Sequence, residues 1–193
     1  MTAGAAIPAW NAAGVLPPVH PSASGNSSDR SPYLIDLFSL VDRFSTSPER
    51  RAILDGLLRY RAALHQVGIV SGFQWLDGSF TENVEILDNR PPRDMDIVTF
   101  ADLNGINQQL LIENHKELFD TGCAKEKFTM DSYFVQLGGS LSSESIRRVA
   151  YWYSMWSHRR NGLWKGFLQV DLGPSQDAKA RELLSFHGGP THE

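Results

Sequence analysis

The sequence contains one cysteine, Cys123, so the chain cannot form an internal disulfide. Such sparing use of cysteine is typical of a reducing compartment, and we expect a cytoplasmic protein. The sequence also lacks any run of about 18 apolar residues, the length that a membrane-spanning helix needs. The first residues do not show the basic stretch followed by an apolar stretch that marks a secretory signal. Neither a membrane span nor an export signal is therefore predicted.

Positive charge is also scarce. The chain carries 18 Lys and Arg against 22 Asp and Glu, a formal net charge of -4, so no overall basic field attracts nucleic acid. The six histidines do not show the spacing of metal ligands, which argues against a zinc site. There is no phosphate-binding P-loop and no dinucleotide-binding fingerprint. These absences exclude the commonest sequence-readable classes of nucleotide and metal enzyme.

The 193 residues are enough for one domain with a substantial core. We expect an N-terminal arm and linker at 1–44, a domain at 45–186 and a tail at 187–193. Prolines mixed with bulky apolar residues at 7–18 predict an extended arm that lies on the domain surface, because proline interrupts helices. Residues 22–31 contain almost no apolar side chains and predict a loop.

Hydrophobic periodicity predicts alternating helices and strands in the domain. Strands are expected at 69–76, 94–100, 127–137 and 167–172. Helices are expected at about 46–68, 102–119, 142–156 and 175–184, with one or two helical turns within 32–44. The sequence therefore predicts an α/β (α+β) fold, with a mixed sheet of about four to five strands and helices packed on it.

One stretch of the predicted domain carries the chemistry. Gly78 and Ser79 follow a strand directly, and Asp94 and Asp96 then occur in the next strand. Residues i and i+2 of a strand face the same side, so the two carboxylates would lie together. They would repel each other unless a hard cation lay between them, and Mg²⁺ is commonly held by carboxylates together with substrate phosphates. A third aspartate, Asp171, interrupts a later apolar strand, where this residue type is disfavoured.

This ordered set resembles the DNA polymerase beta-like nucleotidyltransferase superfamily. The resemblance spans about residues 45–172 and implies a nucleotidyltransferase-like fold. It also implies that Gly78 and Ser79 contact a nucleoside triphosphate. By the same resemblance, Asp94, Asp96 and Asp171 are the catalytic carboxylates, and they bind Mg²⁺ or Mn²⁺, with two ions expected.

The proline-rich arm is similar to the start of a small bacterial branch of that superfamily. Two basic residues are further candidates for substrate binding. Lys165 opens the strand that carries Asp171, and Arg93 directly precedes Asp94, so either could neutralise phosphate. Each could equally be a solvated loop charge.

These features predict a transferase that moves a nucleoside monophosphate from an NTP or dNTP to an acceptor and releases pyrophosphate. The acidic net charge favours a protein or small-molecule acceptor over a long nucleic acid, and a short oligonucleotide stays open. The small size suggests a protein partner or a homodimer. A phosphatase of the aspartyl-phosphate class needs Asp-x-Asp-x-Thr, and Thr99 falls one place too late. The alternative is a non-catalytic or partner-dependent antitoxin or regulatory binding protein on the same fold.

Overall fold

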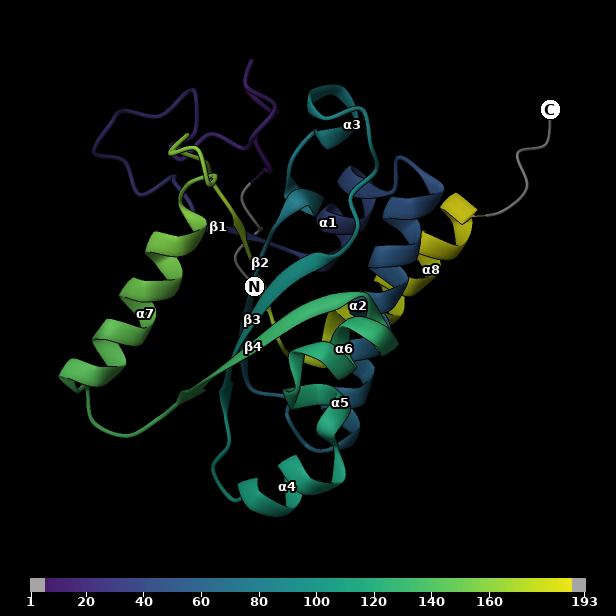
Figure 1. Cartoon of the computed structure of the whole chain (residues 1–193), viewed down its shortest axis with the longest axis vertical. Coiled ribbons are helices and arrows are strands. Elements are labelled where there is room, and N and C mark those ends of the chain that lie inside the picture. The colour runs from purple at the N-terminus through teal and green to yellow at the C-terminus, as the bar shows by residue number, and fades with distance from the viewer. Residues whose placement is uncertain (1–5, 189–193) are drawn as a thin grey trace.

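The fold is built on one five-stranded mixed sheet with the strand order β1-β5-β2-β3-β4 (Figure 1). A computed structural model describes residues 6–188 of the chain. β2 is antiparallel to both β3 and β5, whereas β3 and β4 are parallel, as are β1 and β5. The mixed sheet with packed helices predicted from the sequence is confirmed. The strands are β1 Tyr33–Ile35, β2 Gly72–Asp77, β3 Met95–Asp102, β4 Met130–Leu137 and β5 Leu168–Asp171.

The helices follow the predicted alternation, with some differences in the middle of the chain. The helix predicted at 102–119 is divided into α4 and α5, and α6 was not predicted. The N-cap of α2 is Ser47, whose side chain accepts a hydrogen bond from the Arg50 N–H. The helices are α1 Leu37–Phe44, α2 Pro48–Gln66, α3 Val84–Leu87, α4 Gln108–Asn114, α5 Lys116–Phe119, α6 Thr121–Phe128, α7 Ser143–Trp156 and α8 Asp177–Gly188, with short 3₁₀ turns at Ser79–Thr81 (η1) and Pro174–Gln176 (η2).

The two faces of the sheet are covered unequally. One face packs against α1, α2, α6 and α8 and contains the main core, to which Leu76 and Ile97 belong. The other face carries a smaller, aromatic-rich cluster in which Trp75 and Phe167 pack against Trp156 of α7. Figure 1 shows α7 on one side of the sheet and α2, α6 and α8 on the other. This second face is therefore the more open one.

The proline-rich stretch at 7–18 runs along the domain and is fixed at several points. Val15 and Leu16 are buried, and the Leu16 carbonyl accepts a hydrogen bond from the Gly166 N–H at 2.6 Å. The Gly14 carbonyl accepts one from the Asn83 N–H at 2.9 Å. The arm thus ties together two loops that are far apart in the sequence.

The first and last elements of the described chain fall within the predicted arm and tail. β1 and α1, which the sequence assigned to the arm and linker, form part of the sheet and of the main core. Of the predicted tail at 187–193, the first two residues end α8, and the other five lie outside the described residues. Within residues 6–188, no helix has both the length and the apolar character needed to cross a membrane.

Candidate active site

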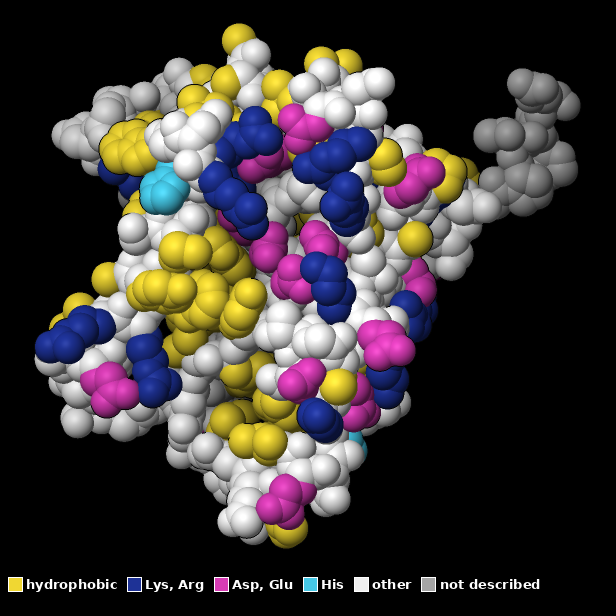
Figure 2. All heavy atoms as spheres, viewed as in Figure 1, with side chains coloured by type: hydrophobic (Ala, Val, Ile, Leu, Met, Phe, Trp, Pro, Cys, Tyr) yellow, Lys and Arg dark blue, Asp and Glu magenta, His cyan; other side chains and the backbone are white. Residues whose placement is uncertain are grey.

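Acidic side chains from three neighbouring strands meet at one end of the more open face. The strand register places Asp77 of β2 opposite Asp96 of β3, and Asp96 opposite Asp131 of β4. Residues that lie directly opposite each other share a face of the sheet. Asp94 precedes Asp96 by two residues and therefore faces the same side. We call these four residues the carboxylate cluster, and Figure 2 shows acidic side chains gathered on this face with basic ones around them.

Lys125 of α6 joins two members of the carboxylate cluster. Its Nζ lies 2.6 Å from Oδ2 of Asp94 and 2.9 Å from Oδ2 of Asp131. Hydrogen bonds to Asp131 and Asp94 hold the pKa of the Lys125 ammonium above its usual range. Within residues 6–188, no three His, Cys, Asp or Glu side chains converge closely enough to hold a metal ion. The side chain of Lys125 is half exposed, so it can move into solvent.

Asp96 is the electrostatic centre of the cluster. Burial, together with the carboxylates of Asp77, Asp94 and Asp131, raises the pKa of Asp96 to about 7. Gly78 makes room for this side chain. A Cβ at Gly78 would overlap Oδ2 of Asp96, and the glycine also adopts a φ of 83°, which L side chains rarely adopt. The glycine of the Gly-Ser pair is thus required by the approach of Asp96.

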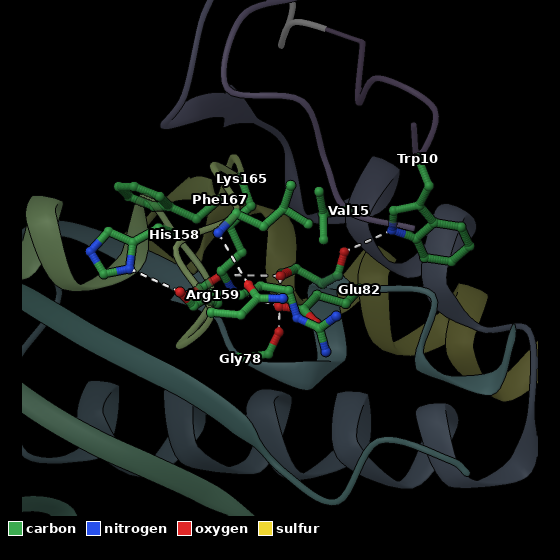
Figure 3. Close-up of polar contacts among 12 residues, drawn as sticks. Trp10, Val15, Gly78, Glu82, His158, Arg159, Lys165 and Phe167 are labelled. Carbon is green, nitrogen blue, oxygen red and sulfur yellow. Dashed lines mark hydrogen bonds and ion pairs between the residues drawn. The ribbon is translucent and has the colours of Figure 1, made fainter. Parts of the chain in front are cut away.

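A buried ion-pair network supports the cluster from the side of β2. Lys165 Nζ lies 2.8 Å from Oδ1 of Asp77 and 3.0 Å from Oε1 of Glu82, and all three side chains are buried. Arg159 Nε lies 3.1 Å from the other oxygen of Glu82 (Figure 3). Burial lowers the pKa of Lys165, but Asp77 and Glu82 together outweigh this effect and raise it. Lys165 is therefore a buried counter-ion, already paired within the protein.

The two other predicted substrate ligands lie near the cluster without partners. Ser79 opens the 3₁₀ turn after β2, and its hydroxyl makes no hydrogen bond to any residue that the structure describes. Arg93 precedes the cluster on an exposed stretch, and its guanidinium forms no ion pair within residues 6–188. Both side chains are thus free to meet a ligand.

Asp171 does not join the other predicted carboxylates. β5 pairs with β2 so that Asp171 lies opposite Phe73, whereas Asp96 lies opposite Asp77, four residues further along β2. This offset amounts to about 13 Å at ~3.3 Å per residue. Asp171 is exposed, and its Oδ1 accepts a hydrogen bond from the Gly173 N–H at 2.7 Å. Asp171 therefore cannot complete a triad with Asp94 and Asp96, and that part of the predicted site is corrected.

Sequence reasoning missed Asp131, the third carboxylate that the structure supplies. A signal for it is present, because Met130-Asp131 opens β4 just as Met95-Asp96 opens β3. Parallel neighbouring strands of this kind bring the same position of each strand side by side. Asp77, which directly precedes Gly78, was also missed.

The charges at this end of the sheet do not balance. Five carboxylates face three cationic side chains that are ion-paired with them, and Arg93 is a fourth cation nearby, unpaired within the described residues, which leaves an excess of one negative charge when all are ionised. A hard divalent cation such as Mg²⁺ or Mn²⁺ suits this all-oxygen donor set and would offset that excess. The carboxylates are Asp77, Glu82, Asp94, Asp96 and Asp131, and the ion-paired cations are Lys125, Arg159 and Lys165.

Comparison with protein families gives one match. Residues 8–171 match a family described as a family of unknown function, DUF6932. The chain belongs to this family. The matched region contains residues 8–18 of the proline-rich stretch, all five strands and every member of the carboxylate cluster, and it ends at Asp171. No curated protein and no solved structure is found to match the chain.

Proposed function

We propose that this protein is a metal-dependent nucleotidyltransferase that transfers a nucleoside monophosphate from an NTP or dNTP and releases pyrophosphate. The observation that carries the proposal is the carboxylate cluster on adjacent strands, placed beside Gly78 and Ser79. The resemblance of the Gly-Ser and Asp-x-Asp pattern to polymerase beta-like enzymes supports it, with Asp131 in the role first assigned to Asp171. An NTP-dependent reaction also suits the cytoplasmic setting expected from the sequence.

In this proposal, Asp94, Asp96 and Asp131 hold Mg²⁺ or Mn²⁺. The ion would neutralise the triphosphate and stabilise the charge that develops on the leaving oxygen. Lys125 would leave its position between Asp94 and Asp131. Because its side chain is half exposed, such an ion pair contributes little stability and its ammonium is readily hydrated.

The chain's own residues would position the reacting groups. Ser79 and Arg93 are free to bind phosphate oxygens, whereas Arg159, on the loop before β5, is ion-paired with Glu82. The acceptor oxygen attacks the α-phosphorus, and the bond from that phosphorus to the bridging oxygen of pyrophosphate breaks. A carboxylate of the cluster takes the proton of the attacking hydroxyl. Lys165 acts only as a positioning residue, since its partners Asp77 and Glu82 flank Gly78 and Ser79.

The test uses labelled NTPs and dNTPs with Mg²⁺ or Mn²⁺, and it follows label transferred to the protein itself or to added acceptors. Asp96→Asn and Asp131→Asn should reduce transfer by on the order of 100-fold or more. Asp171→Asn is the matched control, because it changes an aspartate on the same face at the opposite end of the sheet and retains the oxygen that Gly173 needs. Failure of wild-type protein to bind any nucleotide in a metal-dependent way would overturn the proposal.

The alternative function, a partner-dependent regulatory protein, is favoured by one observation. α7 exposes apolar side chains along its length. A contiguous exposed apolar patch often marks a surface that a partner protein covers. In that case Asp96→Asn and Asp131→Asn would leave partner binding unchanged, while changes on α7 would abolish it. The exposed side chains are Ile146, Val149, Tyr151, Tyr153 and Met155.

A further inference from the structure

A pair of aromatic rings lies beside the carboxylate cluster on the open face of the sheet. Tyr133 of β4 follows Asp131 by two residues, so both side chains face the same side of the sheet. The Tyr133 ring centroid lies 4.5 Å from that of Trp152 on α7. Both residues are only partly buried. Figure 2 shows an apolar patch on this face, directly next to the acidic side chains.

Tyr133 lies next to the cluster in the register of the sheet. Asp131 is opposite Asp96, and Tyr133 is opposite Val98, two residues further along both strands. Along the strand, Tyr133 and Asp131 are about 7 Å apart. The aromatic pair and the acidic site are therefore neighbouring parts of one surface.

Trp152 is held in place from behind. Its ring centroid lies 5.7 Å from that of Trp156, which is buried and packs against Phe167 of the sheet. The rings of Tyr133 and Trp152 are thus anchored on two elements, with Trp156 as a backing. The planes of the two rings are tilted by 42° to each other, so a planar ligand would stack on the face of one ring and meet the other at an angle. Aromatic side chains that are fixed in this way bind such a ligand at a low cost in conformational entropy.

The charges beside the two aromatic rings decide which planar ligand fits. The carboxylates next to these rings would repel an anionic ligand that binds without a cation. A purely apolar peptide would make no favourable contact with them. A ligand with a flat ring at one end and metal-bound phosphates at the other matches both parts. Only a sugar separates the base of a nucleotide from its α-phosphate. This short separation agrees with the distance of about 7 Å along the strand between Tyr133 and Asp131.

We propose that Tyr133 and Trp152 form a stacking platform for the base of the nucleoside triphosphate. This inference rests on the proposed function, whose substrate site it extends. Stacking recognises the π-face that every base presents, so the platform tolerates different bases. Base selection, if present, would come from other side chains.

Binding of ATP, GTP, CTP and UTP with Mg²⁺, and of the four free nucleosides without metal, tests the platform. Trp152→Leu and Tyr133→Leu should each weaken nucleotide binding about 10-fold, and they should leave binding of Mg²⁺-tripolyphosphate unchanged. Tyr133→Phe keeps the ring and should bind as wild type. Trp164→Leu is the matched control, since Trp164 is 67% exposed on the loop before β5. Circular dichroism spectra confirm that each variant is folded.

The outcomes separate this inference from the proposed function. Nucleosides that quench tryptophan fluorescence in wild type but not in Trp152→Phe support the platform, even where no transfer occurs. Transfer that proceeds with an unchanged KM for NTP in both leucine variants overturns the platform and leaves the proposed function standing. Absence of any nucleoside or nucleotide binding to wild type overturns the platform too.

Discussion

The carboxylate of Asp96 lies against the Cα of Gly78, and a side chain at position 78 would overlap its Oδ2 atom. Gly78→Ala should therefore destabilise the protein in two ways. The φ of 83° costs an alanine about 1–2 kcal/mol, and the overlap adds on the order of 1–3 kcal/mol or displaces the Asp96 carboxylate. Urea denaturation measures the loss of stability.

Gly68 provides the control for that experiment. Its φ is 85°, nearly that of Gly78, but a Cβ there would meet nothing within 4 Å. Gly68→Ala should therefore lose only the stability that the unfavourable φ costs an alanine, about 1–2 kcal/mol. Equal losses for the two variants would show that Asp96 does not restrict position 78.

The pKa of Asp96 predicts how stability depends on pH in the metal-free protein. That pKa is about 7 in the folded chain and near 3.8 in the unfolded chain. Between these values the folded protein keeps a proton that the unfolded chain has lost, so stability falls as the pH rises through this window, by about 4 kcal/mol in all. Asp96→Asn removes this dependence.

Urea denaturation of wild type and Asp96→Asn at pH 4 and pH 8 measures the effect. The variant should gain about 4 kcal/mol relative to wild type between the two pH values. Addition of Mg²⁺ at pH 8 should stabilise wild type and not the variant. The same pH slope in both proteins would contradict the environment described for Asp96.

Lys125 competes for the carboxylates that a metal would need. Lys125→Met removes an ammonium that contacts Asp94 and Asp131. We expect tighter binding of Mn²⁺, by about 10-fold or more, because Mn²⁺ no longer has to displace the ammonium of Lys125 from the two carboxylates. Isothermal titration calorimetry checks this. The control is Lys127→Met, which removes an equally exposed lysine that pairs with Glu117. A Mn²⁺ affinity that both variants share with wild type would remove Lys125 from the site.

Local patterns in the sequence were enough to predict most of the fold. The cap at Ser47 and the apolar spacing after it determine α2, and apolar runs mark four of the five strands. β1 was missed because its three residues form a strand only by pairing with β5, some 135 residues later in the chain. Short strands of this kind are defined by tertiary contacts rather than by their own propensity.

The site was predictable only in its local part. Asp94 and Asp96 lie on one face by strand geometry alone. The third carboxylate depends on which strand lies beside β3 and in which direction it runs, and these are properties of the whole sheet. β5 runs in the same direction as β3 and ends at Asp171, so Asp171 lies at the far end of the sheet, whereas Asp131 opens β4 in register with Asp96. An aspartate within an apolar strand identified a candidate but could not place it.

The buried pair of Lys165 and Asp77 yields the last prediction. Lys165→Met leaves Asp77 and Glu82 buried without their cation, and loss of one partner of such a pair typically costs about 3–5 kcal/mol. Lys179→Met, at an exposed position on α8, should have almost no effect. The double variant Asp77→Leu with Lys165→Met should recover part of the loss, since both charges are then absent. Chemical denaturation of the two single variants and the double variant gives the coupling between the residues. Additive losses would mean that the two charges do not interact, and they would contradict the ion pair between Lys165 and Asp77.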